Sequence, residues 1–173
     1  GNYPLNNIGN NLAQFHEKEV EGEEVIRNGE SFYKISNIDS MRPFFMSIVS
    51  NSDHWMFISS NGSLSAGRKN SSYALFPYYT DDKITESNET TGSKSIFIVL
   101  RNESRYLWEP FTDRYNGIYK ISRNLYKNVL GNKIVFEEIN YDLKISFSYE
   151  WNSSEIYGFI RKSSIENLST EDV

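Results

Sequence analysis

The chain has 173 residues, the length of one domain and enough to bury a hydrophobic core. Its net charge is −5 and its Lys and Arg residues are scattered, which argues against a nucleic-acid partner. No apolar stretch approaches the roughly 20 residues of a membrane helix, so no membrane contact is expected. The absence of Cys excludes disulfides and thiolate chemistry; the cytoplasm is favoured, and a periplasmic location stays open.

The first part of the chain predicts short strands joined by tight turns. Helix signals are poor, and only residues 12–20 favour a turn or two of helix. Asn28-Gly29 and Asn61-Gly62 are dipeptides that supply the positive φ values of a hairpin turn. Residues 43–49 and 54–60 are apolar at both odd and even positions, so each is expected to be a strand covered on both faces.

The second part of the chain continues the pattern of strands and turns. Residues 96–100 form an apolar run, expected to be a strand covered on both faces. Asn116-Gly117 precedes another strand, and Gly131-Asn132 separates that strand from the next. Residues 143–151 alternate between apolar and polar side chains, which predicts a strand with one wet face, and residues 152–154 are expected to end it.

These segments give about ten to twelve strands, which is too many for one flat sheet. Aromatic residues make up 15% of the chain and also favour β-structure. The sequence therefore predicts an all-β, antiparallel two-layer β-sandwich with few or no helices, in a single domain over residues 1–173. Residues 81–93 are expected to form a loop, and residues 1–24 and 164–173 are expected to be poorly ordered. Gly1 indicates that the natural start of the polypeptide lies elsewhere, so the chain is expected to be a piece of a larger protein.

Groups for metal binding and catalysis are few. The chain has only two His residues, His16 and His54, and a metal site usually needs several convergent ligands. We expect His54, beside Trp55, to be a packed, hydrogen-bonded histidine. Neither a nucleophile elbow nor a glycine-rich phosphate loop occurs. No catalytic residue, metal or cofactor is therefore expected.

Two pairs of adjacent carboxylates are relevant because sugar hydrolysis uses two acids across a cleft. Glu137 and Glu138 are neighbours on a predicted strand, so their side chains should point to opposite faces of the sheet. Asp81 and Asp82 lie beside the predicted loop, where the geometry stays open. The sequence therefore predicts no acid–base pair in the strand.

Aromatic side chains are the stronger candidates for a binding surface. Exposed Trp and Tyr rings stack on the apolar faces of sugars, while neighbouring polar groups bind the hydroxyls, and the same rings also serve interfaces between domains. The candidates for a carbohydrate-binding or interdomain role are Trp55, Tyr78, Tyr79, Asp81, Asp82 and Trp108. The alternative is that these rings fill the core.

Residues 41–84 and 149–169 resemble the N-terminal β-sandwich of bacterial proteins of the cellobiose phosphorylase type, including GFIR at 158–161 and IEN at 165–167. In that group a supersandwich, which is galactose-mutarotase-like, precedes an (α/α)-barrel catalytic domain. The resemblance implies a domain that packs on the catalytic domain of the same polypeptide and helps to assemble a homodimer. The general acid of those enzymes lies in the barrel, so no catalytic residue carries over.

Two hypotheses follow for the function. The first is a non-catalytic accessory domain of a glycoside phosphorylase or hydrolase, which predicts an apolar patch on an exposed sheet face. The alternative is an independent carbohydrate-binding module, which predicts an open groove with exposed aromatics that bind an oligosaccharide. A complete small hydrolase is disfavoured because no convergent acid–base pair is predicted.

Overall fold

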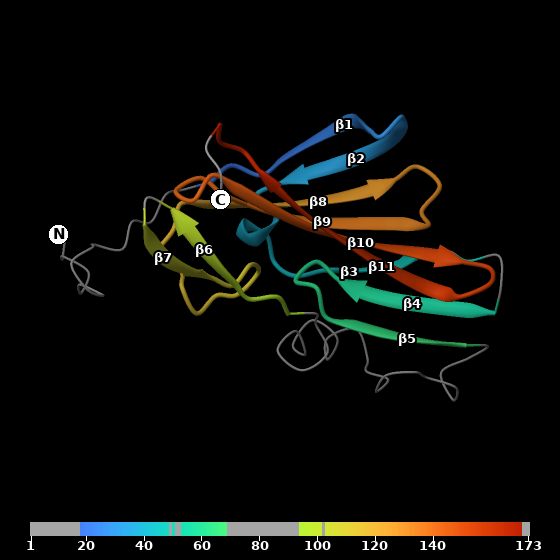
Figure 1. Cartoon of the computed structure of the whole chain (residues 1–173). Coiled ribbons are helices and arrows are strands. Elements are labelled where there is room, and N and C mark those ends of the chain that lie inside the picture. Colours follow the sequence, from blue (N-terminus) through green and yellow to red (C-terminus); the bar gives the residue numbers. More distant parts are fainter. Residues whose placement is uncertain (1–17, 49, 51–52, 69–93, 102, 171–173) are drawn as a thin grey trace.

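Strands dominate the computed structural model, which describes residues 18–48, 50, 53–68, 94–101 and 103–170 (Figure 1). Within these residues there are eleven strands and one short 3-10 helix. In chain order they are β1 (Glu21–Arg27), β2 (Glu30–Ser36), η1 (Ile38–Ser40), β3 (Phe45–Ile48), β4 (His54–Ser59), β5 (Leu64–Arg68), β6 (Phe97–Arg101), β7 (Ser104–Trp108), β8 (Ile121–Asn128), β9 (Lys133–Asn140), β10 (Ile145–Ser154) and β11 (Gly158–Asn167).

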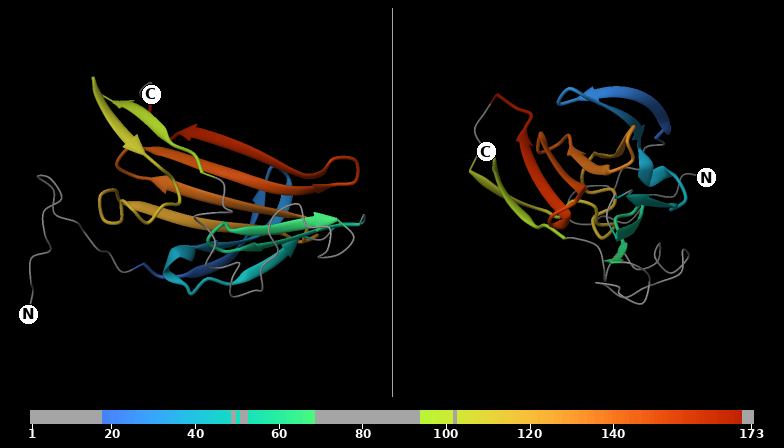
Figure 2. Two further views of the ribbon diagram at one scale, coloured as in Figure 1. Left: turned by 90° about the horizontal axis from the view of Figure 1, so that it is seen from below. Right: turned by 90° about the vertical axis from the view of Figure 1, so that its right-hand side faces the viewer.

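The strands form three antiparallel sheets. The largest has six strands in the order β1-β2-β8-β9-β10-β11, and the others are β3-β4-β5 and β6-β7. The two smaller sheets lie on the same side of the large one, and the β1–β2 hairpin bends away from the rest of that sheet (Figure 2). The predicted all-β, antiparallel, sandwich-like fold is confirmed.

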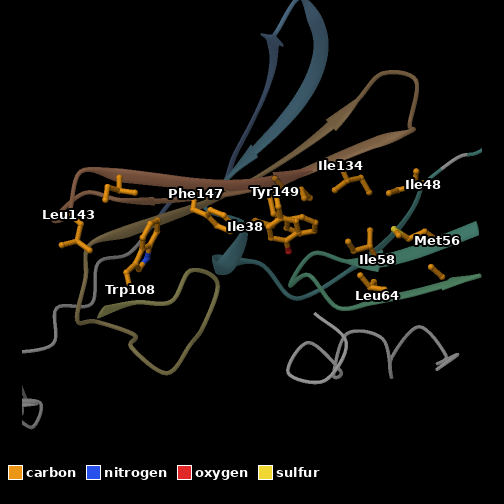
Figure 3. Packing of buried hydrophobic residues seen from close by; sticks show 14 of the residues in the cluster. Ile38, Ile48, Met56, Ile58, Leu64, Trp108, Ile134, Leu143, Phe147 and Tyr149 are labelled. Carbon is orange, nitrogen blue, oxygen red and sulfur yellow. The ribbon is translucent and has the colours of Figure 1, made fainter. Parts of the chain in front are cut away.

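The core lies between the large sheet and the two small ones. A single cluster of buried apolar side chains draws on all three sheets, and includes Ile58 of β4, Trp108 of β7 and Phe147 of β10 (Figure 3). Phe136 and Tyr149 stack in it with ring centroids 5.0 Å apart. Burial of each such side chain contributes about 1.5–3 kcal/mol, so this layer supplies the main stabilisation of the fold.

Strand β10 shows how the alternating sequence produces this core. Ile145, Phe147 and Tyr149 point to one side and are almost completely buried. Ser146 and Ser148 point to the other side of the sheet. A strand is present as predicted, but its bounds differ: β10 begins at Ile145 and continues through Ser154, and the turn lies at residues 155–157. The expected wet face is wrong for the first half of β10, because Ser146 and Ser148 are buried.

The predicted hairpin turns are present where Asn and Gly adopt positive φ. Asn28 has φ of 51° and Gly29 has φ of 77°, and these two residues join β1 to β2. Gly62 joins β4 to β5 with φ of 90°. A Cβ atom at Gly62 would lie 2.7 Å from the Tyr149 hydroxyl oxygen, so this turn also requires the small residue for space.

Some sequence expectations differ from the structure. The run at residues 96–100 contributes strand β6, but Ile98 and Leu100 are exposed, so only one face of that strand is covered. Phe45 of β3 is likewise 40% exposed, which makes the expectation of two covered faces wrong for β3. A strand is covered on both faces only where a second layer is present, and the local sequence does not encode that layer.

The ends of the described chain contain more strand than expected. Strand β1 occupies Glu21–Arg27, and β11 extends to Asn167, six residues past Arg161. Residues 18–20 have no regular structure, and the rest of the segment that favoured a helix lies outside the described residues, as does the predicted loop at 81–93.

Candidate interaction surface

The β6–β7 hairpin presents an exposed apolar face to solvent. Ile98 of β6 lies opposite Leu107 of β7 in the antiparallel register, so their side chains share one face. Leu100 shares it through alternation along β6, as does the exposed Arg105, which lies opposite Leu100 on β7, and Ile96 lies just before β6. The four apolar side chains, Ile96, Ile98, Leu100 and Leu107, which we call the outer face of β6–β7, are between 49% and 70% exposed. Clustered exposed apolar side chains of this kind mark interaction sites.

The opposite face of the same hairpin is part of the core. Val99 and Trp108 are buried, and Trp108 is only 1% exposed. The Phe97 ring lies 5.6 Å from Trp108 and 5.1 Å from Phe147 of β10, measured between ring centroids. A two-stranded hairpin is marginal alone, so this packing holds the outer face in a defined position.

A buried carboxylate attaches the end of β7 to the large sheet. Glu138 of β9 is 2% exposed and accepts a hydrogen bond from Trp108 Nε1 at 2.9 Å. It also accepts bonds from the Phe111 backbone N–H at 2.7 Å and from Arg123 Nε at 2.8 Å. One side chain thus joins β7, β8, β9 and the segment after β7.

Arg123 completes this attachment. Its remaining guanidinium nitrogens donate to Asp113 Oδ1 at 2.8 Å and to the Thr112 carbonyl at 2.6 Å. Burial acts to lower the pKa of Arg123, but the charge of Glu138 and the hydrogen bonds to Asp113 and Glu138 outweigh it and raise that pKa. The guanidinium therefore stays charged, and its role is structural.

A second set of hydrogen bonds fixes the other end of the hairpin. Arg101 of β6 donates to the Leu143 carbonyl at 2.9 Å and 3.2 Å. It also donates to Asn167 Oδ1 at 3.0 Å and to Ser169 Oγ at 2.8 Å. These contacts place the C-terminal end of β11 beside β6.

The structure places two of the predicted aromatic candidates in different environments. Trp108 is in the core, so its ring is not accessible to a sugar. Trp55 of β4 is half-buried, with its ring centroid 5.5 Å from that of Phe57. The ring centroid of Phe57 also lies 6.1 Å from that of Phe45 on β3, so the three rings form a row along the β3-β4-β5 sheet. The candidates Tyr78, Tyr79, Asp81 and Asp82 lie outside the described residues.

Glu137, the neighbour of Glu138, forms hydrogen bonds that stabilise the large sheet. Glu137 lies on the opposite side of β9 from Glu138, as predicted, and accepts hydrogen bonds from Asn124 and Tyr126, both at 2.8 Å. Burial raises the pKa of the Tyr126 hydroxyl, and the charge of Glu137 raises it further. Tyr126 is therefore neutral at physiological pH and is poorly suited to proton transfer there.

His54 is a packed side chain, as its sequence context indicated. Its half-buried ring meets Phe159 edge to face, with centroids 6.1 Å apart, and lies beside Gly158 at the start of β11. Across the described part of the chain, no group of three or more His, Asp or Glu side chains could hold a metal ion. In the same residues no helix is long and apolar enough to cross a membrane.

Comparison with known proteins gives no match: no protein-family model matches the sequence, and no curated protein does. The accessory-domain hypothesis predicted an apolar patch on an exposed sheet face, but the sequence did not indicate which residues form it. The run at residues 96–100 has no polar alternation, so nothing in its pattern distinguishes Ile98 from the buried Val99.

Proposed function

We propose that this chain is a non-catalytic accessory domain of a glycoside phosphorylase or hydrolase, and that the outer face of β6–β7 docks on the catalytic domain of the same polypeptide. The observation that carries the proposal is this face, which is apolar, exposed and held by buried contacts behind it. The link to carbohydrate chemistry is supported by the resemblance of residues 41–84 and 149–169.

The energetics favour a covered surface. Burial of one Ile or Leu side chain is worth about 1.5–3 kcal/mol, so covering the four side chains of the outer face would contribute several kcal/mol to docking. Arg101, which alternation places on the core-facing side of β6, binds Asn167 and Ser169 and so holds residue 169 beside the end of the hairpin.

The test is binding between this chain and the separately purified region that follows residue 173 in the parent polypeptide. We expect a complex that is lost when Ile98→Asp and Leu107→Asp are combined. Ile160→Asp on β11 is the matched control, because this exposed Ile lies away from the hairpin, and it should bind like the unaltered chain. Equal binding by all three chains would refute the proposed docking face.

A second experiment separates the accessory role from sugar binding and hydrolysis. The isolated chain is titrated calorimetrically with a panel of common oligosaccharides and assayed with aryl glycosides. The proposal predicts neither heat of binding nor turnover. Binding with a defined stoichiometry would support the carbohydrate-binding module instead, and turnover would contradict both functions.

A further inference from the structure

Strands β10 and β11 carry a partly buried tryptophan and a partly buried arginine on paired positions. Arg161 of β11 lies directly opposite Trp151 of β10 in the antiparallel register, so both side chains point to the same side of the large sheet. Alternation along β10 places Tyr149 on that side too, and Tyr149 belongs to the core. Phe159, two residues before Arg161, packs on the same core and meets His54 of β4. Arg161 therefore lies at the margin of the core, on the side that faces β4.

Two of the three nitrogen atoms of the Arg161 guanidinium have no hydrogen-bond acceptor among the described residues. Nη1 donates to Ser163 Oγ at 2.8 Å. Nε and Nη2 are covered from solvent and find no acceptor in the described part of the chain, and the same holds for Trp151 Nε1. Nε and Nη2 form one edge of the planar guanidinium, and a carboxylate binds such an edge with both of its oxygens. Buried donors in proteins are nearly always paired, so three on adjacent side chains indicate a site for an acceptor.

Arg101 and Arg123 show what the same edge does elsewhere in this protein. Arg101 donates from both Nε and Nη2 to one backbone carbonyl oxygen. Arg123 donates from Nε to Glu138, and the charge of that carboxylate raises the pKa of Arg123. Burial instead lowers the pKa of Arg161, and among the described residues only Tyr149 opposes that shift. Arg161 is thus a partly buried cation with no carboxylate partner in the described ranges.

The Tyr149 ring holds this guanidinium in place. Arg161 Cζ lies 4.6 Å from the centroid of the ring, in a cation–π contact, and the ring itself stacks on Phe136. Burial raises the pKa of the Tyr149 hydroxyl, so the phenol is neutral and does not balance the positive charge. With the cation over the ring and Nη1 bound to Ser163, the Nε–Nη2 edge has a fixed orientation. A fixed pair of donors loses little conformational entropy when it binds a ligand.

We infer that the Nε–Nη2 edge of Arg161, together with Trp151 Nε1, binds the carboxylate of a small organic acid. The two carboxylate oxygens match the paired donors of the edge, and one of them also accepts from the indole N–H. A small ligand fits better than a partner protein, because the three nitrogen atoms are covered from bulk solvent. Strand β11 is the outermost strand of the large sheet, so the acid reaches these donors from the sheet edge (Figure 1). The rings of Trp151 and Phe159 then contact its apolar part.

The inference is independent of the proposed docking of β6–β7, and NMR titration of the chain with sodium acetate and with sodium benzoate tests it. The chain has three Trp residues, and Trp151→Phe identifies which indole N–H resonance belongs to Trp151. We expect this resonance to move downfield and to saturate, because the N–H gains a charged acceptor. The Trp108 resonance should stay in place, because its N–H already donates to Glu138. Sodium chloride at the same ionic strength should move neither resonance.

A conservative substitution separates the paired donors from the charge alone. Arg161→Lys keeps the positive charge but removes the planar edge, so the dissociation constant for each carboxylate should rise at least about tenfold. Arg105→Lys on β7 is the matched control, because this exposed arginine lies on another sheet, and it should leave the constant unchanged. Circular dichroism establishes that each variant is folded.

Three results would overturn the inference. The first is the absence of a saturable shift of the Trp151 resonance with either carboxylate in the unaltered chain, which needs no variant to fold. The second is equal affinity of Arg161→Lys and the unaltered chain. The third is a shift that sodium phosphate produces and the two carboxylates do not, because the donors would then select a tetrahedral anion.

Discussion

Replacing Glu138 by Ala removes the one carboxylate that joins Trp108, Phe111 and Arg123. Removing one partner of a buried ion pair costs about 3–5 kcal/mol, because the other charge is left without compensation. The Trp108 N–H also loses its acceptor, at a cost of about 1–3 kcal/mol for a buried donor. Arg123 keeps its hydrogen bond to Asp113, which offsets part of the loss. We therefore expect the free energy of unfolding to fall by about 3–5 kcal/mol in total.

The measurement is urea unfolding followed by tryptophan fluorescence. A loss of this size is a large share of the roughly 5–15 kcal/mol that stabilises an ordinary domain, so a milder variant is needed as well. Glu138→Gln keeps the size and one acceptor oxygen but removes the charge, and should lose about 1–3 kcal/mol.

Glu166→Ala on β11 is the control, because the side chain of this exposed Glu makes no hydrogen bond or ion pair with another described residue. This substitution should change the free energy of unfolding by no more than about 0.5 kcal/mol. If Glu138→Ala cost no more than Glu166→Ala, the assignment of Glu138 as the attachment point of β7 would be wrong.

Two further predictions concern the turns. Gly62→Ala should destabilise the protein more than Gly29→Ala: both place a Cβ at positive φ, for about 1–2 kcal/mol, but only the Cβ at position 62 meets the Tyr149 hydroxyl. Equal shifts in the urea midpoint would contradict this. Hydrogen bonds from Lys133 and Asn128 lower the pKa of Glu30 below its ordinary value of 4.5, so its contribution is complete above that value and is lost as the pH falls through the lower, folded pKa. Between about pH 6 and about pH 3, the free energy of unfolding should therefore fall less steeply for Glu30→Gln than for the unaltered chain. If the free energies of the two chains fell in parallel with pH, Glu30 would not be the source of this pH dependence.

Local sequence signals predicted the elements that depend on local chemistry. Alternation indicated the buried face of β10, since side chains on a strand point alternately to its two sides. The Asn-Gly dipeptides at 28–29 and 61–62 indicated two hairpin turns, since these residues adopt positive φ at low cost. The separation of Glu137 from Glu138 followed from the same alternation.

The rest depends on contacts between distant segments. Glu138 lies directly opposite Arg123 in the β8–β9 register, and that pairing allows a carboxylate in the core. Trp108 is buried because β7 packs on the large sheet, and its sequence neighbours give no sign of this. The exposure of Ile98 depends on the absence of a layer over the hairpin among the described residues, which the apolar run did not predict.

Hydrogen–deuterium exchange of β6 and β7 tests the proposed docking most directly. Because we propose a catalytic domain in the same polypeptide, the isolated chain is compared, under the same conditions, with a polypeptide that also carries that domain. If the proposed domain covers Ile98 and Leu107, the amides of the hairpin should exchange more slowly in the longer polypeptide. Unchanged exchange in the hairpin, with new protection elsewhere on the sandwich, would contradict the assignment of this face.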